Sequence, residues 1–387
     1  MRVLIAFDKF KDALTARQAS EAAAGALQAK HPGWQIDLCP LTYGGEGFCE
    51  TLCRNHGERI EQIDVTGPLL APTVAPIGFV SVWSLPTGVR RQLVAGGQAE
   101  IAVAGLGSAS GLELLPRDQR DPWQTTTLGT GELLRYALHE KAGLILLGIG
   151  GSATNDLGVG ALAALGFKFL DAAGATVAVP VPAAWERIQR IDGSGAVKLP
   201  PIFIACDVTN PLLGPHGAAT IFGPQKGLRA EDLPRLEAQA ARMAALLCAA
   251  CGQPNSLADI PGAGAAGGIG FGLMAACRAK LVPGFDLVAD WLDLPARLAA
   301  ADLVLTGEGR FDATSLGGKG PGRLLAEARR LGKPVHVIAG SLGLSALSGA
   351  EGTADGQLHA ITPAGMPLAE ALPRTAELLA TIVGRLL

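Results

Sequence analysis

The stretch LILLGIGGSATNDLGVGALAALGF, residues 144–167, decides the fold class. An apolar run of strand length is followed by a segment rich in glycine and polar residues, and then by an alanine- and leucine-rich run typical of a helix. Glycine costs backbone entropy, so the middle segment is shaped for something that approaches its backbone closely. The first candidate is an anion bound at the N-terminus of the following helix.

The same alternation of strands and helices occurs at both ends of the chain. RVLIA (2–6) and WQIDLC (34–39) predict strands around a helix over 15–30, where Thr15 and Gln18 fit a capping box. Near the C-terminus, the predicted elements are the strands DLVLTG, PVHVIAG and LHAI, a helix around GRLLAEARRLG and a closing helix from Leu368. This order is typical of a parallel sheet with right-handed crossovers.

The middle of the chain has a different organisation. Residues 66–97 predict short strands and turns, and a second α/β set follows that contains LILLGIGG and PIFIACDV. A complete set between two incomplete ones indicates an inserted domain. We therefore expect one domain from residues 1–65 and 291–387, an inserted domain at 66–290, and a ligand in the cleft between them.

Composition narrows the class of protein. A chain of 387 residues favours two domains, and a net charge of -3 without a long basic run argues against nucleic acid or an anionic membrane as a partner. The 52 glycines interrupt every apolar run before it spans a bilayer. The N-terminal apolar run is too short for a signal peptide and ends at Asp8 and Lys9, so we expect a cytoplasmic location.

The seven cysteines form no disulfide framework. Cys248 and Cys251 make a CxxC inside a helical pattern without a second pair nearby, which favours buried thiols over a metal site.

Five polar or glycine-rich stretches fall at the ends of predicted strands. They are AFDKFKDALTA, LTYGGEG, GIGGSATND, ACDVTNPLLGPHGAATIFGPQKG and TGEGRFDATSLGGKGPG. Ligands of open α/β sheets bind outside the carboxyl ends of the strands. Neither GxxxxGK[ST] nor a GxGxxG after the first strand occurs, so we expect a nucleotide or phosphosugar site built from several loops, with carboxylates for Mg²⁺.

These motifs resemble those of the bacterial two-domain glycerate kinases, the glycerate 2-kinase type. IAFDKFKDALTA, GGEG, GIGGSATND, CDVTNPLLGPHGAATIFGPQKG, GAGAAGG, TGEGRFD and GGKGPG occur in the order found in that family, over nearly the whole chain. The resemblance implies ATP-dependent, Mg²⁺-dependent phosphorylation of D-glycerate, usually to 2-phosphoglycerate. It also implies an α/β fold in which both chain ends form a Rossmann-like domain with a second α/β domain inserted.

The chain departs from the family pattern at two places. Tyr43 precedes GGEG where the family usually has an aspartate, and the run GLGS precedes ASGL where a glutamate is common. Two alternatives therefore stay open: a kinase for a related small hydroxy acid, and a non-catalytic sensor of sugar acids. The oligomeric state stays open as well.

Phosphoryl transfer to an alcohol needs positioning, charge neutralisation and a proton acceptor. We expect Asp207 and Asp156 to serve as base or Mg²⁺ ligand, with Asp207 the preferred ligand and Lys11 also catalytic. The substrate-binding candidates are Asp8, Arg310, Asp312 and Lys319. The phosphate-binding candidates are Gly150, Gly151, Ser152, Thr154, Asn155 and Lys226. An aspartate after a strand is as typical of a turn or helix cap, and Arg310 has a possible ion pair with Glu308 or Asp312.

Overall fold

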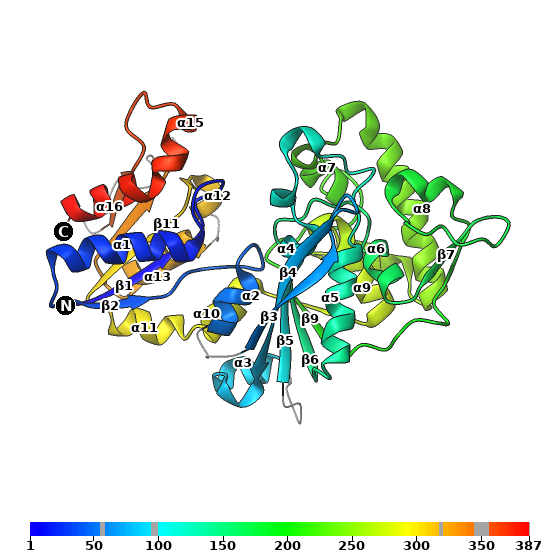
Figure 1. The fold of residues 1–387 in the computed structure, drawn as a ribbon, viewed down its shortest axis with the longest axis horizontal. Helices are drawn as coiled ribbons and strands as arrows, with labels where there is room; N and C mark the ends of the chain where they lie inside the picture. The colour runs from blue at the N-terminus through cyan, green and yellow to red at the C-terminus, as the bar shows by residue number, and fades with distance from the viewer. Residues whose placement is uncertain (55–58, 94–99, 317–319, 344–355, 387) are drawn as a thin grey trace. The chain divides into compact units, whose positions relative to one another are not determined.

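The computed structural model describes residues 1–54, 59–93, 100–316, 320–343 and 356–386. The chain divides into two compact units (Figure 1). Unit 1 combines Met1–Thr42 with Val288–Leu387, and unit 2 is Tyr43–Leu287. Both chain ends therefore belong to one unit, and the middle of the chain forms the other.

Unit 1 contains a parallel sheet of five strands in the order β15-β13-β11-β1-β2. Its elements are β1 Arg2–Phe7, α1 Ala16–Lys30, β2 Gln35–Leu38, α11 Leu294–Ala300, β11 Leu303–Gly307, β12 Arg310–Phe311, α12 Ala313–Leu316, α13 Gly320–Arg330, β13 Val335–Ala339, β14 Ser341–Leu342, β15 Gly356–Ala360, α15 Leu368–Ala371 and α16 Thr375–Leu386. The chain leaves β1 toward β2 on one side, and β11 leads to β13 and β15 on the other. The sheet thus has a topological switch point between β1 and β11, the usual location of a ligand site in such sheets.

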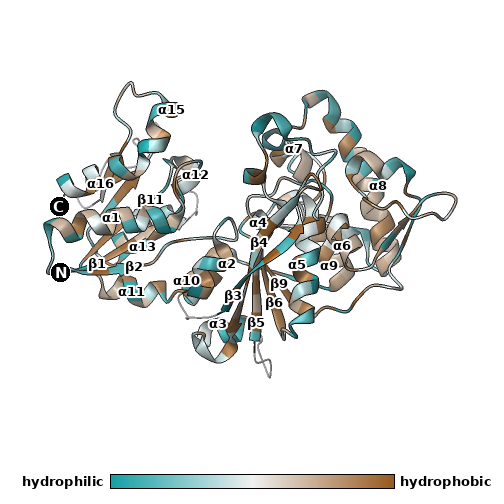
Figure 2. Ribbon diagram, viewed as in Figure 1, coloured by the Kyte–Doolittle hydropathy of each residue, from teal (hydrophilic) through white to brown (hydrophobic). Residues whose placement is uncertain are grey.

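Helices α1 and α16 cover one face of this sheet. Ala23 and Leu27 of α1 and Leu379 of α16 form a common core with Val3 and Ile5 of β1. The alternate β1 residues point to the other face of the sheet, where α11 and α13 pack against β1 and β11. Figure 2 shows the hydrophobic residues concentrated on the strands.

Unit 2 contains a mixed sheet of six strands in the order β10-β9-β6-β5-β4-β3. Its elements are α2 Phe48–Arg54, β3 Arg59–Thr66, β4 Pro72–Ser81, α3 Thr87–Gln92, β5 Glu100–Gly105, α4 Leu106–Ser110, α5 Leu128–His139, β6 Leu144–Gly148, α6 Val159–Ala164, β7 Lys168–Leu170, β8 Arg190–Asp192, β9 Ile202–Ala205, α7 Ala218–Phe222, α8 Leu233–Cys251, α9 Ile269–Cys277 and β10 Lys280–Val282. Helix α10, Gly284–Trp291, crosses the boundary between the units. Strands β5, β6, β9 and β10 are parallel, so their carboxyl ends meet at one sheet edge.

The first boundary between the units differs from the sequence prediction of 65/66. Strand β3 pairs with β4 along its whole length, and α2 packs on β4 and β5. These contacts place the chain from Tyr43 onward in unit 2. Sequence periodicity reports local structure and carries no record of this pairing, so the prediction placed the boundary too late.

The ends of the predicted helices agree with the structure at α1 and differ at the C-terminus. Thr15 and Gln18 form the predicted capping box at the start of α1. The closing helix predicted from Leu368 is divided into α15 and α16 by a 3-10 turn at Leu372–Arg374. Pro373 lies in that turn, and a proline has no N–H to continue a helix.

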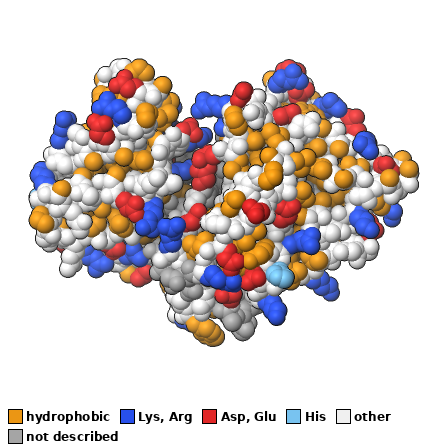
Figure 3. All heavy atoms as spheres, viewed as in Figure 1, with side chains coloured by type: hydrophobic (Ala, Val, Ile, Leu, Met, Phe, Trp, Pro, Cys, Tyr) orange, Lys and Arg blue, Asp and Glu red, His pale blue; other side chains and the backbone are white. Residues whose placement is uncertain are grey.

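No helix within the described ranges has the length and apolar character needed to cross a membrane. On the face shown in Figure 3, basic and acidic side chains are interspersed.

Candidate active site

The loop after β6 packs backbone to backbone against the GGEG loop, residues 44–47. The N–H of Gly150 donates to the carbonyl oxygen of Gly44 at 2.6 Å. A Cβ atom on Gly150 would lie 2.8 Å from the Cα and N of Gly45, and one on Gly148 would lie 2.8 Å from the Cα of Gly44. These distances leave no room for a side chain. The contact between two protein loops therefore accounts for these two glycines.

The next glycine is used differently. Gly151 has a φ of +74°, and a Cβ placed on it would meet no atom within 4 Å. Gly151 is exposed, and among the residues that the structure describes, neither its N–H nor that of Ser152 has an acceptor. Successive N–H groups at a turn with such a φ form a nest, which is a backbone concavity that binds anions. Gly151 and Ser152 therefore offer an anion site.

Residues 110–112 fix the direction in which this nest points. The N–H of Leu112 donates to the carbonyl oxygen of Gly151 at 2.7 Å, and the N–H of Ala153 donates to that of Ser110 at 3.0 Å. The carbonyl of Gly151 and the N–H of Ser152 belong to one trans peptide and point in opposite directions. Since the carbonyl faces Leu112, the N–H of Ser152 faces away from Leu112.

Asp156 is buried within unit 2, where its carboxylate binds neighbouring donors. Its carboxylate is buried and accepts hydrogen bonds from the N–H and hydroxyl of Thr127, both at 2.8 Å, and from the N–H groups of Gly158 and Gly160. Burial raises the pKa of Asp156, and these hydrogen bonds oppose the rise. The last two donors lie at the start of α6, so this geometry favours a helix-capping role over the base or metal role expected from the sequence.

Lys226 is also buried, with 1% of its surface exposed. Its Nζ donates to the Oγ of Ser152 at 2.9 Å and to the carbonyl oxygen of Thr154 at 2.6 Å. Burial lowers its pKa to about 7, although the charge of Asp156 opposes this shift. From the sequence, Lys226 was expected to bind phosphate at an exposed position. The structure instead places the ammonium beneath the loop, because two acceptors of that loop point inward to it.

Two further predicted phosphate-binding residues are buried in the same loop. The Oγ1 of Thr154 and the Oδ1 of Asn155 are buried and have no hydrogen-bond partner in the described part of the chain. The sequence placed Ser152 and Thr154 at the opening of the following helix, but α6 begins at Val159. The irregular segment is longer than expected because the carbonyl of Thr154 accepts from Lys226 and Asp156 accepts from Thr127, which ties the segment to neighbouring loops before the helix starts.

Asp207 lies just after β9, whose neighbour in the sheet is β6. It is exposed, and both of its carboxylate oxygens accept from the N–H of Phe285, at 3.0 and 3.1 Å, in the first turn of α10. The ring of Tyr43 lies 5.6 Å from that of Phe285. The backbone contact holds the carboxylate in place at the sheet edge that also carries the nest.

The carboxylate of Asp207 fits the needs of Mg²⁺. The described residues contain no group of three or more His, Cys, Asp or Glu side chains placed to hold a metal ion. Mg²⁺ commonly uses one or two carboxylates together with phosphate oxygens and waters, so a single exposed carboxylate near an anion site suits it.

In unit 1, Asp8 and Lys11 lie at the topological switch point. The N–H of Asp8 donates to the carbonyl oxygen of Gly307 at 2.9 Å, and the N–H of Gly309 donates to that of Lys9 at 3.3 Å. Lys11 is exposed in the turn that follows. The loops after β1 and β11 are therefore joined by backbone hydrogen bonds, and both carry predicted substrate-binding residues.

Arg310 and Asp312 pair with each other. Their side chains are 3.3 Å apart, and 71% of the Arg310 side chain is exposed. Asp312 also accepts from the N–H and hydroxyl of Thr314, which lowers its pKa and caps the short helix α12. The ion pair is the alternative that the sequence had offered for Arg310. Lys319 lies outside the described residues.

Sequence reasoning missed several residues that hold the loop after β6. Ser110 and Thr127 bind it directly, and Gly267 accepts from the N–H of Leu157 at 3.0 Å. One signal was present in the sequence: the threonine run at 125–127 stands before a helix and is fully buried.

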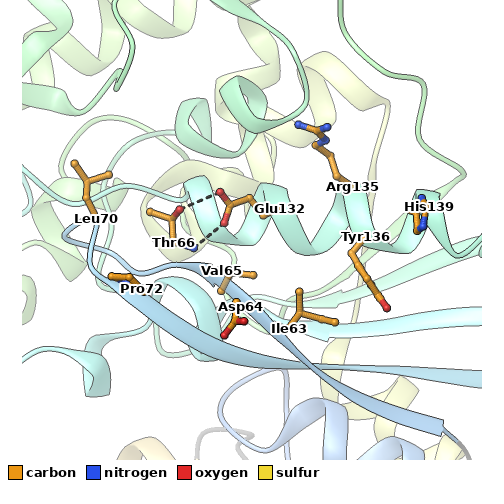
Figure 4. A pocket seen from close by; sticks show the side chains of 10 residues that line it. All are labelled: Ile63, Asp64, Val65, Thr66, Leu70, Pro72, Glu132, Arg135, Tyr136 and His139. Atoms are coloured by element: carbon orange, nitrogen blue, oxygen red, sulfur yellow. Dashed lines mark hydrogen bonds between the residues drawn. The ribbon is translucent and has the colours of Figure 1, made fainter.

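A groove of about 560 Å³ lies elsewhere on unit 2, between β3 and α5 (Figure 4). Glu132 accepts there from the N–H and hydroxyl of Thr66, and the Tyr136 hydroxyl donates to Glu61. None of the predicted site residues lines it.

Comparisons with known proteins identify the family of this chain. The model of the glycerate kinase family matches residues 3–387. Glycerate kinase of Bacillus subtilis is 38% identical over 97% of this chain and 94% of its own length. Glycerate 2-kinase of Escherichia coli is 38% identical over 88% of this chain and 86% of its own length.

A solved structure supports the fold as well. The crystal structure of a protein assigned as glycerate kinase 2 from Salmonella typhimurium LT2 has a TM-score of 0.75 and 38% identity, over 100% of this chain and 97% of that one. The predicted α/β fold and family resemblance are thereby confirmed. The relatives are kinases, which decides between an enzyme and a non-catalytic sensor. The chain belongs to the glycerate kinase family, whose members phosphorylate glycerate.

Proposed function

We propose that this enzyme transfers the γ-phosphoryl group of ATP to D-glycerate and forms 2-phosphoglycerate, with Mg²⁺ as cofactor. The main support is the edge of the unit 2 sheet. Gly148 of β6 is paired with Ala205 of β9, so the nest after β6 and Asp207 after β9 follow neighbouring strands. An anion site beside an exposed carboxylate is the combination that phosphoryl transfer requires.

The residues of unit 2 take two roles in this proposal. The N–H groups of Gly151 and Ser152 hold phosphate oxygens. Asp207 accepts the proton of the attacking hydroxyl or helps to hold Mg²⁺, and both roles stay open. Mg²⁺ bound to the nucleotide would supply neutralisation of phosphate charge.

The residues of unit 1 are proposed to bind glycerate. Asp8 follows β1 and Arg310 follows β11, so both lie at the switch point of that sheet. Lys11, in the turn after β1, is proposed to be catalytic. The guanidinium of Arg310 suits a carboxylate because it donates two parallel hydrogen bonds. Its ion pair with Asp312 is solvent-exposed and exchangeable. Lys319 is proposed to bind the substrate as well.

The test is ADP release from ATP and Mg²⁺ with D-glycerate and a panel of small hydroxy acids. We expect D-glycerate to give the highest kcat/KM and EDTA to abolish turnover. Phosphorus NMR of the product should show the phosphate on the secondary hydroxyl. A phosphate on the terminal hydroxyl would contradict the stated product, and no ADP release with any acceptor would contradict the proposed reaction.

Tyr43 favours a second candidate, a kinase for a related hydroxy acid. Its ring packs beside Phe285, whose N–H holds Asp207, so a residue that departs from the family pattern lies close to the proposed site. Turnover of another acid above that of D-glycerate in the same panel would support this candidate.

A further inference from the structure

The ammonium of Lys226 is buried and donates to two neutral oxygen atoms of the loop after β6. Its hydrogen bonds go to the hydroxyl of Ser152 and the carbonyl of Thr154, and in the described residues no carboxylate oxygen lies within 4.0 Å of its Nζ. Burial of an ammonium disfavours folding unless its hydrogen bonds compensate. A role confined to stability would be filled equally well by an apolar side chain, which makes this arrangement informative.

The bond from Lys226 determines where the Ser152 proton points. A serine hydroxyl has one proton to donate and lone pairs to accept with. Since the ammonium donates to Oγ, the hydroxyl proton must be directed at some other acceptor. Within the described ranges Ser152 has no such acceptor, and 6% of the residue is exposed, next to the exposed Gly151.

We propose that Lys226 is a positioning residue that turns the hydroxyl proton of Ser152 into the anion site formed by the N–H groups of Gly151 and Ser152. The site then presents three donors to a phosphate oxygen group, and Lys226 supports them without touching the ligand. This inference rests on the proposed function for the identity of its ligand, a phosphoryl group of the nucleotide or of the phosphorylated product.

A double-mutant cycle tests the proposal. Lys226→Met, Ser152→Ala and the double variant are compared with wild type, and Lys198→Met, at an exposed position, is the control. Isothermal titration calorimetry gives the Kd for Mg·ATP and for 2-phosphoglycerate. A lost hydrogen bond to a charged phosphate should weaken binding about tenfold to a hundredfold. We expect this loss in each single variant and no further loss in the double variant, because Lys226 acts through Ser152.

Other outcomes would overturn the inference. They are normal affinity for both ligands in Lys226→Met, or losses that multiply in the double variant as they do for independent effects. If circular dichroism shows that Lys226→Met is unfolded, Ser152→Ala decides alone, and unchanged affinity for both ligands refutes the role of the hydroxyl. The ligand whose Kd changes identifies which phosphoryl group the nest holds.

The experiments distinguish a failure of the proposed function from a failure of this inference. Wild type that binds Mg·ATP but releases no ADP with D-glycerate would contradict the reaction while the binding cycle still tests Lys226. Wild type that binds neither ligand would overturn this inference directly.

Discussion

Replacing Lys226 with methionine should change how the stability of unit 2 depends on pH. Burial lowers the pKa of Lys226 from 10.5 to about 7 in the folded protein. Between these two values the unfolded chain binds more protons at this site than the folded chain does. The free energy of unfolding therefore rises with pH in this window for wild type, relative to a variant without the amine.

The size of the effect follows from the two pKa values. One proton taken up on unfolding gives a slope approaching about 1.4 kcal/mol per pH unit. Around pH 7 the folded protein still holds part of the proton, so the gain in wild-type stability from pH 7 to pH 9 amounts to about 2 kcal/mol. The comparison with Lys226→Met removes contributions from groups that titrate equally in both proteins.

The assay is urea unfolding of wild type, Lys226→Met and the surface control Lys198→Met at pH 7, 8 and 9. Peptide-resolved hydrogen exchange identifies the transition that belongs to unit 2. We expect the free energy of unfolding of wild type to rise relative to that of Lys226→Met as the pH rises. Lys198→Met should show the same pH dependence as wild type. Parallel pH profiles for wild type and Lys226→Met would refute the reasoning, because they would show that Lys226 has its ordinary pKa in the folded state.

Four further substitutions test the site and the packing of its glycines. Asp207→Asn should lower kcat by about a hundredfold to ten-thousandfold with little change in Tm if the carboxylate is the base, and kcat within a few-fold of wild type would return it to a turn-forming role. Gly150→Ala should destabilise the fold by about 1–3 kcal/mol in urea unfolding, because its Cβ would lie 2.8 Å from the backbone of Gly45. Gly25→Ala, in helix α1 with open space around it, should instead stabilise by about 0.5–1 kcal/mol, and equal effects at the two glycines would contradict the packing argument. Asp156→Asn should lower Tm, because an amide nitrogen would face donors of a buried site, and an unchanged Tm would contradict its capping role.

The strands and the loops at their ends were predictable from the sequence. Apolar runs such as residues 144–147 are bounded by glycine, and this local pattern persists in the fold because both faces of the sheet are covered. The convergence of the loops also followed from one rule, that parallel strands carry their ligand loops at one edge. The unit boundary at Tyr43 did not follow, because it depends on the pairing of β3 with β4.

The buried position of Lys226 was outside the reach of sequence reasoning. A lysine between glycines in a polar loop is usually exposed, and nothing near it in the sequence suggests two acceptors. Those acceptors, Ser152 and the carbonyl of Thr154, are supplied by a segment more than seventy residues away. A local pattern identifies the kind of residue at a site, whereas its partner and burial come from the tertiary structure.

The glycines at the end of β6 and in the loop that follows show why one motif required two explanations. Gly148 and Gly150 face the GGEG loop at distances that exclude a side chain, so their identity is required by the protein itself. A Cβ on Gly151 would meet open space, its φ is +74°, and within the described residues neither its N–H nor that of Ser152 has an acceptor. The packed glycines hold this loop against the GGEG loop, and this rigidity keeps the N–H groups of Gly151 and Ser152 in one direction. Preorganised donors of this kind bind an anion without reordering the backbone, so the packing of the inner glycines is itself part of how the outer one would bind phosphate.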